Sequence, residues 1–198
     1  MKSFWIGKKM MKFKDNAVWL RLVNESDAEF ILKLRLDNKY NQFLSKVKGD
    51  LQSQVEWIRD YKKEEKLGIQ YYFIIERSDG LPCGTVRVYD FNKDSFSWGS
   101  WILNEQKTRL AAIESAFKVY EYGFKNLGFK KSHFEVMKGN ERVIKFHSKM
   151  GAVIVGEDAE NLYFSISKES VMQAWEDLEG LIKGAPSHTV AERNSRKF

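Results

Sequence analysis

The sequence has little of what several classes of protein depend on. Cys83 is its single cysteine, so no disulfide can form within the chain. Such low cysteine use fits a reducing compartment. No apolar run approaches the roughly 20 residues that are needed to cross a bilayer. Residues 1–16 are basic, but they contain no apolar segment of signal-peptide length. We therefore expect a cytoplasmic protein that has no membrane partner.

Motifs for several kinds of chemistry are also missing. One cysteine and three scattered histidines offer no spacing for a metal site, so we expect no metal. Neither a Gly-x-x-x-x-Gly-Lys-Ser/Thr phosphate loop nor a Gly-x-Ser-x-Gly nucleophile elbow occurs. The chain has 33 basic and 27 acidic residues and a net charge of +6, which favours anionic partners. Because acidic residues are interspersed and no aromatic–basic stripe is visible, we expect no nucleic acid as partner; a nucleic-acid binder would show strong, salt-dependent binding.

What the sequence does contain is the composition of a folded protein. Of its 198 residues, 43% are hydrophobic and 14% are aromatic, which is enough for a substantial core. The length predicts one domain with appendages. We expect a loosely ordered basic leader over 1–16, the main domain over 17–168, a C-terminal helix over 169–183 and a disordered tail over 184–198.

The N-terminal third predicts one strand and two helices. Residues 18–23 have the apolar and β-branched content of a strand. The polar residues 24–27 then provide a helix start, with apolar residues at helical spacing behind them. Ser53 and Glu56 fit a capping box, in which each side chain satisfies a free backbone donor of the other. We therefore expect a second helix over about 53–66.

The middle of the chain predicts an antiparallel meander. Its three strands are expected at 70–77, 84–91 and 96–103. The turns between them contain Gly80 and Asn92, residue types that tight turns favour. Gly99 interrupts the third strand, which often marks a bulge or a place where a ligand approaches closely.

The C-terminal half changes to helical spacing. Apolar residues from Ile113 to Leu127 predict an amphipathic helix that Gly128 ends. Asn140 opens a second helix that ends before Gly151. The remaining elements are strands at 132–137, 152–155 and 162–166 and a helix at 168–183. The order predicts an α/β protein with a mixed sheet (α+β mixed sheet), and the helix after Leu103 has free amide groups that can hold an anion.

This order, with the residues at its junctions, resembles the GNAT superfamily of acyl-CoA-dependent N-acetyltransferases. The similarity covers about residues 18–168. The segments that carry it are 84–91 (GTVRVYDF), 97–103 (SWGSWIL), 112–116 (AIESA) and 138–147. Within the superfamily the chain looks most like the branch found among surface-polysaccharide genes, which acetylates amino groups on nucleotide-linked sugars. The resemblance implies a GNAT-like fold: a central, mostly antiparallel twisted sheet of about seven strands with helices on both faces.

The resemblance also implies acetyl-CoA as co-substrate and a binding site for it. The strand that pairs with the pantetheine arm maps onto Trp101, Ile102 and Leu103. The pyrophosphate loop maps onto Gln106, Lys107, Thr108, Arg109, Leu110 and Ala111, with Ala112 next in the helix. Where the family has a central glycine, this chain has Arg109, whose side chain can obstruct the approach of backbone amides to phosphate. Lys107, Thr108 and Arg109 would then supply charge and a hydroxyl instead. The alternative is an ordinary basic helix start with weakened or lost CoA binding.

The predicted helix that begins at Asn140 carries a candidate acid. Asn140 matches the family's asparagine that touches the CoA arm, and Phe146 lies on the same helix. Seven residues after that asparagine the family commonly has a tyrosine that protonates the leaving thiolate, and here the position is His147. Seven residues are two helical turns, so Asn140 and His147 share a face. An imidazolium with a pKa of about 6.5 can donate a proton near neutrality. The alternative is a histidine that only packs.

The acceptor side is predicted from the same fold. The candidate bases for the amine proton are Asp90, at the end of the second meander strand, Asp94 and Glu135. The alternatives are that Asp90 and Asp94 are turn residues and that a water relay takes the proton. The connection after the first helix and the meander line the acceptor cleft in this family. The candidate acceptor-binding residues are Arg35, Asn38, Tyr40, Arg87 and Trp98. Arginine can hold a diphosphate bidentately and an aromatic face suits a sugar, although Trp98 fits the core equally well.

The predicted function is acetyl-CoA-dependent N-acetylation of a primary amine, by direct attack on the thioester in a ternary complex. The expected acceptor is a small molecule, an amino sugar carried on a nucleotide. One alternative is an acetyltransferase for protein N-termini or ribosomal proteins. Another is a catalytically degenerate GNAT-like binding module. Exposed sheet edges and the C-terminal helix are compatible with a homodimer.

Overall fold

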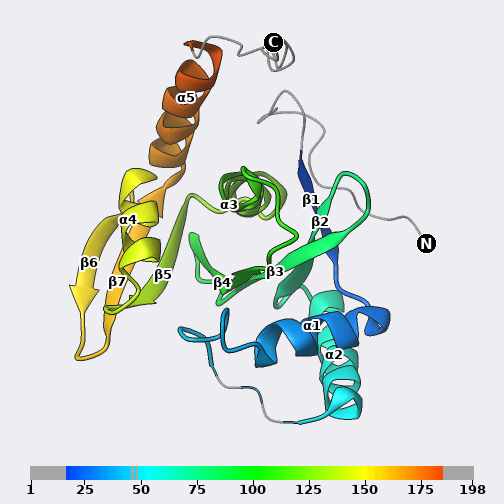
Figure 1. Cartoon of the computed structure of the whole chain (residues 1–198). Coiled ribbons are helices and arrows are strands. Elements are labelled where there is room, and N and C mark those ends of the chain that lie inside the picture. The colour runs from blue at the N-terminus through cyan, green and yellow to red at the C-terminus, as the bar shows by residue number, and fades with distance from the viewer. Residues whose placement is uncertain (1–16, 46, 48, 185–198) are drawn as a thin grey trace, which may run out of the picture.

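The computed structural model describes residues 17–45, 47 and 49–184 (Figure 1). The predicted leader and all of the predicted tail after Gly184 lie outside the described residues. Seven strands form one sheet in the order β1-β2-β3-β4-β5-β7-β6. All neighbours are antiparallel except β4 and β5. The strands are β1 (Val18–Leu22), β2 (Tyr71–Arg77), β3 (Pro82–Tyr89), β4 (Ser95–Leu103), β5 (Lys131–Met137), β6 (Val153–Glu157) and β7 (Asn161–Ser167).

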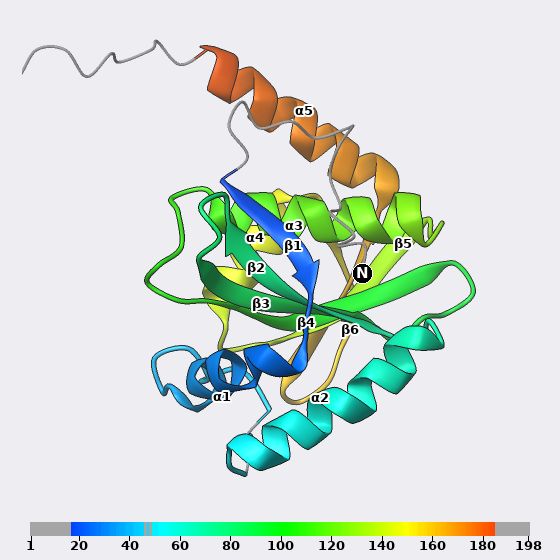
Figure 2. The same ribbon diagram turned by 90° about the vertical axis from the view of Figure 1, so that its right-hand side faces the viewer.

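Helices cover both faces of this sheet, as Figure 2 shows. α3 and α4 lie on one face, with α5 outside α3, and α1 and α2 lie on the other. A short 3-10 turn (Glu25–Asp27) precedes α1. The helices are α1 (Ala28–Leu36), α2 (Leu51–Lys66), α3 (Ala111–Glu121), α4 (Glu141–Lys149) and α5 (Lys168–Gly184). The predicted α/β architecture with its mostly antiparallel sheet of seven strands is therefore confirmed. No helix among the described residues is long and apolar enough to span a membrane.

Two apolar cores hold the layers together. The larger one lies between the sheet and α3, α4 and α5, and includes Phe73, Val86 and Phe96, all fully buried. The smaller one joins α1 and α2 to the other face through Ile31, Ile58 and neighbouring residues. Burial of each such side chain contributes roughly 1.5–3 kcal/mol. The β2–β3 hairpin supplies both cores, because consecutive side chains of a strand point to opposite faces.

The start of α2 differs from the prediction. The helix begins at Leu51 and Asp50 is its N-cap, with a carboxylate that accepts from the backbone N and the Oγ of Ser53, both at 2.9 Å. Ser53 is therefore inside the first turn, and the predicted capping box is wrong. Glu56 instead accepts from Gln52 Nε2 at 2.8 Å, one turn apart on the helix surface. Aspartate is as favourable an N-cap as serine, and Asp50 precedes Ser53 in the chain, so the N-cap lies three residues earlier.

The helix after β4 is interrupted before its predicted end. α3 stops at Glu121 and a π-helical turn (Tyr122–Asn126) follows. A Cβ atom added at Gly123, in this turn, would lie 2.1 Å from Cε1 of Phe96. The backbone of Gly123 thus packs directly against the Phe96 ring, and no side chain would fit between them. Gly128, with φ of +80°, ends the segment as predicted.

A buried carboxylate fixes β1 to α3. Glu114 is fully buried, and its Oε2 accepts from the backbone N of Ala17 at 2.9 Å and of Val18 at 3.0 Å. One turn on, the ammonium group of Lys118 lies 4.6 Å from the ring centroid of Trp19. Burial raises the pKa of Glu114. The first strand of the domain is thereby tied to the first turn of α3, directly after the predicted pyrophosphate loop.

Candidate active site

The sheet opens between β4 and β5. These parallel strands pair only at Ser95 with Lys131 and at Phe96 with Ser132. Beyond Phe96, β4 keeps its pairing with β3 but presents an unpaired edge towards β5. Trp101, Ile102 and Leu103, the predicted pantetheine-binding residues, lie in this stretch. An unpaired strand edge offers backbone donors and acceptors to any extended ligand that runs beside it.

Trp101 joins this strand to the two helices above it. Its Nε1 donates to Ser115 Oγ of α3 at 3.1 Å, and its ring centroid lies 5.2 Å from that of Phe146 on α4. Ile102 is buried and Leu103 half-buried. The structure therefore brings the predicted strand and Phe146 to the same opening. Their contact with a CoA arm stays a prediction.

A bulge bends β4 in the middle of its free stretch. Thr85 pairs with Ile102 but Arg87 pairs with Gly99, so β4 has one residue more than β3 at this point. Ser100 takes the left-handed conformation with φ of +48°, and its carbonyl accepts from Thr85 Oγ1 at 3.1 Å. The interruption predicted at Gly99 is thus a bulge. It turns Ser100 into a cavity on the α1–α2 face of the sheet.

The predicted pyrophosphate loop follows β4 and leads into α3. Leu110 is the N-cap of that helix and no side chain caps it. Lys107 and Arg109 are exposed, whereas Thr108 Oγ1 is buried and has no hydrogen-bond partner. An orphaned hydroxyl next to a helix N-terminus fits a phosphate oxygen, which would satisfy it. Of the residues described, Asp90 and Ser100 are the non-glycine positions with left-handed φ, so the backbone at Arg109 does not require the glycine of the family pattern.

Asn140 has a local role as well as a predicted one. It is the N-cap of α4, as its position in the sequence predicted, and its Oδ1 accepts from Val143 N at 3.4 Å. Capping uses only the oxygen of the amide. No hydrogen bond involves Nδ2 in the described residues, and its contact with a CoA arm stays a prediction.

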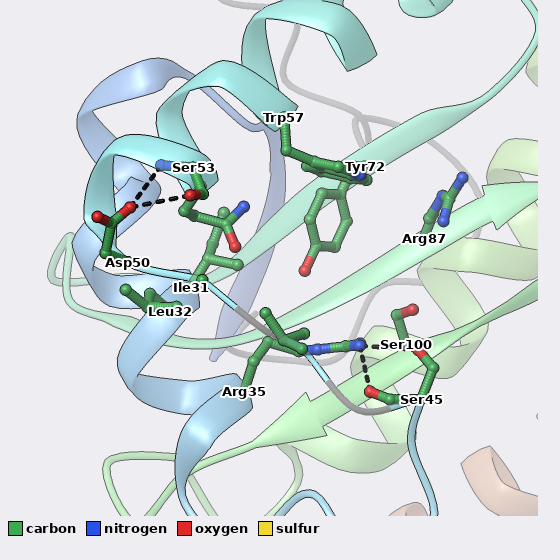
Figure 3. Close-up of a pocket in the computed structure, with 13 residues that line it drawn as sticks. Ile31, Leu32, Arg35, Ser45, Asp50, Ser53, Trp57, Tyr72, Arg87 and Ser100 are labelled. Carbon is green, nitrogen blue, oxygen red and sulfur yellow. Dashed lines mark hydrogen bonds between the residues drawn. The ribbon is translucent and has the colours of Figure 1, made fainter.

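A cavity of about 350 Å³ lies on the opposite face of the sheet, between α1, α2 and the meander (Figure 3). Figure 3 shows Arg35, Tyr72, Arg87 and Ser100 around one space. The lining residues are Ile31, Leu32, Arg35, Ser45, Val47, Gly49, Asp50, Ser53, Gln54, Trp57, Tyr72, Arg87 and Ser100. Ser100 belongs to the bulge of β4, so the cavity meets the strand whose other edge is open. We call it the acceptor cavity.

The acceptor cavity is positively charged. A terminal nitrogen of Arg35 donates to the carbonyl O of Ser45 at 2.8 Å and to its Oγ at 2.9 Å. Burial lowers the pKa of Arg35, and the nearby charge of Arg87 lowers it further. Asp50 is the one acidic residue in the described lining, and its Oδ1 accepts from Ser53 at the N-terminus of α2. Two cations therefore share the space with one carboxylate, and the net positive charge favours an anionic ligand.

Of the five predicted acceptor residues, Arg35 and Arg87 line this cavity and three do not. Tyr40 faces a separate hollow of about 290 Å³ beside the loop 104–106, and Asn38 is exposed in the turn after α1. Trp98 is 5% exposed and lies against Tyr120 and Phe134 in the larger core, on the face of the sheet away from the cavity. Trp98 is thus a core residue, as its alternative reading has it, and contact of Asn38 and Tyr40 with an acceptor stays a prediction. Trp57, Tyr72 and Ser100 were missed, because in the sequence they look like ordinary core or strand residues.

Comparisons with known proteins agree with this geometry. Residues 17–153 match the family described as acetyltransferase (GNAT) domain. The chain belongs to the GNAT acetyltransferase family. A solved structure described as apo FdhC, a nucleotide-linked sugar GNAT, is 55% identical to this acetyltransferase with a TM-score of 0.77, and the match covers 83% of this chain and 94% of that one. A search of curated protein sequences finds no match.

More distant structures share the fold of the acetyltransferase. Spermidine N-acetyltransferase from Vibrio cholerae, solved with CoA and spermine, is 18% identical over 79% of this chain and 98% of that one, with a TM-score of 0.66. Ribosomal-protein-S5-alanine acetyltransferase from Vibrio fischeri is 16% identical over 79% and 96% of the two chains, with a TM-score of 0.68. At these identities the likeness concerns the fold alone. Family membership and the FdhC relative make this chain an N-acetyltransferase.

His147 of the acetyltransferase does not have the environment of an imidazolium acid. It is 4% exposed, and its ring lies 4.2 Å from that of Phe134 and 5.3 Å from that of Trp98, centroid to centroid. Its Nδ1 is buried and has no hydrogen-bond partner. Burial lowers the pKa of His147 to about 3. The expected value near 6.5 is therefore wrong, and the ring is neutral near pH 7, as the packing alternative requires.

The acid sensitivity of the fold tests this assignment. Between about pH 6.5 and 3 an unfolded chain protonates His147 and the folded chain does not, so stability falls as the pH falls. On going from pH 7 to pH 5, wild type should lose about 2 kcal/mol more stability than His147→Phe. Urea unfolding at the two pH values measures this. Equal losses would show that the imidazole charges freely in the fold, and a pH–rate limb between pH 6 and 9 that disappears in His147→Phe would restore the acid role.

Asp90 lies at the closed end of the β4–β5 pair. Its φ is +50°, and its Oδ2 is 2.9 Å from His133 Nε2, while His133 Nδ1 is 2.9 Å from Ser95 Oγ. Ser95 is at the point where β4 and β5 still pair, and Asp90 is not in the lining of the acceptor cavity. The geometry supports the turn-residue alternative and gives no support to Asp90 as base. Among the residues with a described position, no group of His, Cys, Asp or Glu could hold a metal ion.

Proposed function

We propose that this acetyltransferase transfers an acetyl group from acetyl-CoA to a primary amine of a nucleotide-linked amino sugar, by direct attack in a ternary complex. One observation carries the proposal. A cavity with two arginines and a single carboxylate, that of Asp50, among its described lining residues meets the free stretch of β4 at the Ser100 bulge. Donor and acceptor would thus approach the same strand from opposite sides of the sheet.

The donor half of the proposal rests on the opening between β4 and β5. The free edge of β4 around Trp101–Leu103 would hold the pantetheine arm, and the loop with the orphaned Thr108 hydroxyl would hold the pyrophosphate. Backbone amides at the bulge are available to polarise a thioester carbonyl. Lys107 and Arg109 would add charge to the phosphate site.

The acceptor half rests on charge. Arg35 and Arg87 would bind the diphosphate of the nucleotide, since guanidinium groups match phosphate oxygens bidentately. The one carboxylate of the described cavity lining belongs to Asp50, which caps α2 through its Oδ1. We infer that the amine is bound unprotonated and that water takes the proton released by the attack. The relative FdhC, described as a nucleotide-linked sugar GNAT, supports this acceptor class.

The charge of the cavity also ranks the alternatives. A polyamine such as spermine is cationic and would be repelled by Arg35 and Arg87. A protein N-terminus brings no diphosphate to satisfy the two guanidinium groups. A degenerate binding module remains the alternative of a different class, and it predicts negligible affinity for acetyl-CoA.

The experiment is a calorimetric titration of the full chain with acetyl-CoA and with CoA, followed by transfer assays. We expect micromolar binding, and transfer to a nucleotide-linked amino sugar but not to spermine or to an N-terminal alanine peptide. No binding at millimolar acetyl-CoA would favour the binding module. Binding with transfer only to the peptide or to spermine would keep the transferase and overturn the acceptor.

A further inference from the structure

A short chain of hydrogen bonds links Glu64, Gln70 and Arg87 beside the acceptor cavity. Gln70, between α2 and β2, is 5% exposed and is not among the residues that line the cavity. Its Oε1 accepts a hydrogen bond from Arg87 Nε, and its Nε2 donates to the Oε2 of Glu64 on α2. A carboxylate can only accept, so the contact with Glu64 determines that the oxygen of the Gln70 amide faces Arg87.

Two aromatic rings also hold Arg87. Its Cζ atom lies 5.7 Å from the ring centroid of Trp57 and 5.2 Å from that of Tyr89, both within cation–π range. Within the described part of the chain, the hydrogen bond from Nε is the one that the structure gives to this guanidinium. Its two terminal nitrogens, the pair that matches two oxygens of a phosphate, are left for a ligand in the cavity.

We propose that Gln70 is the positioning residue that aims the fork of Arg87 at the diphosphate of the acceptor, with Glu64 fixing the orientation of its amide. This inference rests on the proposed function, because it requires an anionic acceptor in the cavity. A bond to Nε fixes the plane of the guanidinium and leaves both terminal nitrogens for a ligand. Without that bond the side chain can rotate, and ordering it costs part of the binding free energy.

The residue type at position 70 follows from the same chemistry. A glutamate there would neutralise Arg87 and place a second carboxylate against Glu64. An apolar residue would leave the Nε donor and the Glu64 carboxylate without their partners. A neutral amide satisfies both neighbours and leaves the full positive charge of Arg87 for the ligand.

The test uses Gln70→Leu in the full chain, with dTDP, UDP and inorganic pyrophosphate as probes in a calorimeter. A hydrogen bond to a charged group is lost, so we expect about tenfold weaker binding of the probes and unchanged binding of acetyl-CoA. Gln70→Glu should weaken the probes more than Gln70→Leu does. With a confirmed acceptor, Gln70→Leu should raise KM and leave kcat unchanged, a split that a merely structural role would not produce.

Two further variants keep the test decisive. Glu64→Gln removes the preference for one amide orientation and should weaken the probes by a smaller factor, even if Gln70→Leu fails to fold. Gln52→Leu is the matched control, because Gln52 forms the same kind of pair with Glu56 on the exposed surface of α2. It should bind every probe as wild type does.

The outcomes separate this inference from the proposed function. Probe affinities in Gln70→Leu and Glu64→Gln equal to those of wild type would overturn the inference alone. An equal loss for the probes and for acetyl-CoA would also overturn it, since the role would then be structural. If wild type binds pyrophosphate but neither nucleotide, the nucleotide-linked acceptor is wrong. The role of Gln70 is then decided by the pyrophosphate affinities of wild type and Gln70→Leu. If wild type binds none of the three, both are wrong.

Discussion

Replacing Arg87 with methionine is expected to raise the KM for a nucleotide-linked amino sugar about 100-fold, because truncating one partner of a buried charged pair costs about 2–5 kcal/mol. The affinity for acetyl-CoA should stay as in wild type, since the proposed donor site lies at the opening between β4 and β5. Arg87→Lys keeps the positive charge but loses the paired N–H donors of the guanidinium. Its KM should therefore lie between those of wild type and Arg87→Met. Steady-state kinetics with both substrates varied, and calorimetry with acetyl-CoA, measure these effects.

Arg59→Met is the control for this substitution. Arg59 is on α2, and its guanidinium is exposed and pairs with Glu25 at 2.9 Å, outside the acceptor cavity. An exposed ion pair contributes about 1 kcal/mol at most, so the variant should keep its KM within about twofold. If Arg87→Met and Arg59→Met gave the same small change, the cavity would not be the diphosphate site. If Arg87→Met lost acetyl-CoA binding as well, the two half-sites would not be separate.

Arg35 should behave differently from Arg87. It already donates to Ser45 through one terminal nitrogen, so it holds the connection between α1 and α2 as well as facing the cavity. Removing it should therefore cost both the proposed ligand contact and the contact with Ser45. The two arginines differ in their hydrogen-bond partners within the chain. Arg35 donates to Ser45 and Arg87 donates to Gln70.

Local signals predicted most of the fold. Alternating apolar residues and glycine-containing turns located the β2–β3–β4 meander to within about two residues at each end. The π-helical turn at Tyr122–Asn126 was not predicted, because it depends on how Gly123 packs against Phe96. That contact joins residues on different elements and leaves no periodic trace in the sequence.

The candidate site was predicted in part for the same reason. Arg35 and Arg87 were found through the family resemblance, but Trp57, Tyr72 and Ser100 come from three elements that only the folded sheet and helices bring together. Helical spacing predicted Asn140 at the start of α4 and His147 two turns later, and the structure has Asn140 as the N-cap and His147 within the helix. Spacing does not say what packs there, and Phe134, Trp98 and Phe146 exclude water from His147. Burial is a tertiary property, so its effect on the pKa could not be anticipated.

Gly84→Ala is expected to have the largest effect on stability. A Cβ atom at this position would lie 2.2 Å from the carbonyl O of Ile102 and 2.8 Å from Cδ2 of Leu103. The first contact is with backbone, so β4 must move away from β3. We expect a loss of about 3 kcal/mol in the free energy of unfolding, the upper end for overpacking a core. Urea unfolding, with calorimetry of acetyl-CoA binding, measures the change.

The displaced strand links this substitution to the donor site. Ile102 and Leu103 pair with β3 on one edge, and their other edge is the free one that faces β5. A shift that separates β4 from β3 moves that free edge, so acetyl-CoA affinity should fall together with stability. Gly156→Ala is the control: its added Cβ would lie 3.7 Å from Cδ2 of Tyr163, an ordinary contact on β6. That variant should lose less than about 1 kcal/mol and bind acetyl-CoA as wild type. Normal acetyl-CoA binding in a destabilised Gly84→Ala would mean that the ligand does not use the edge of β4 at Ile102.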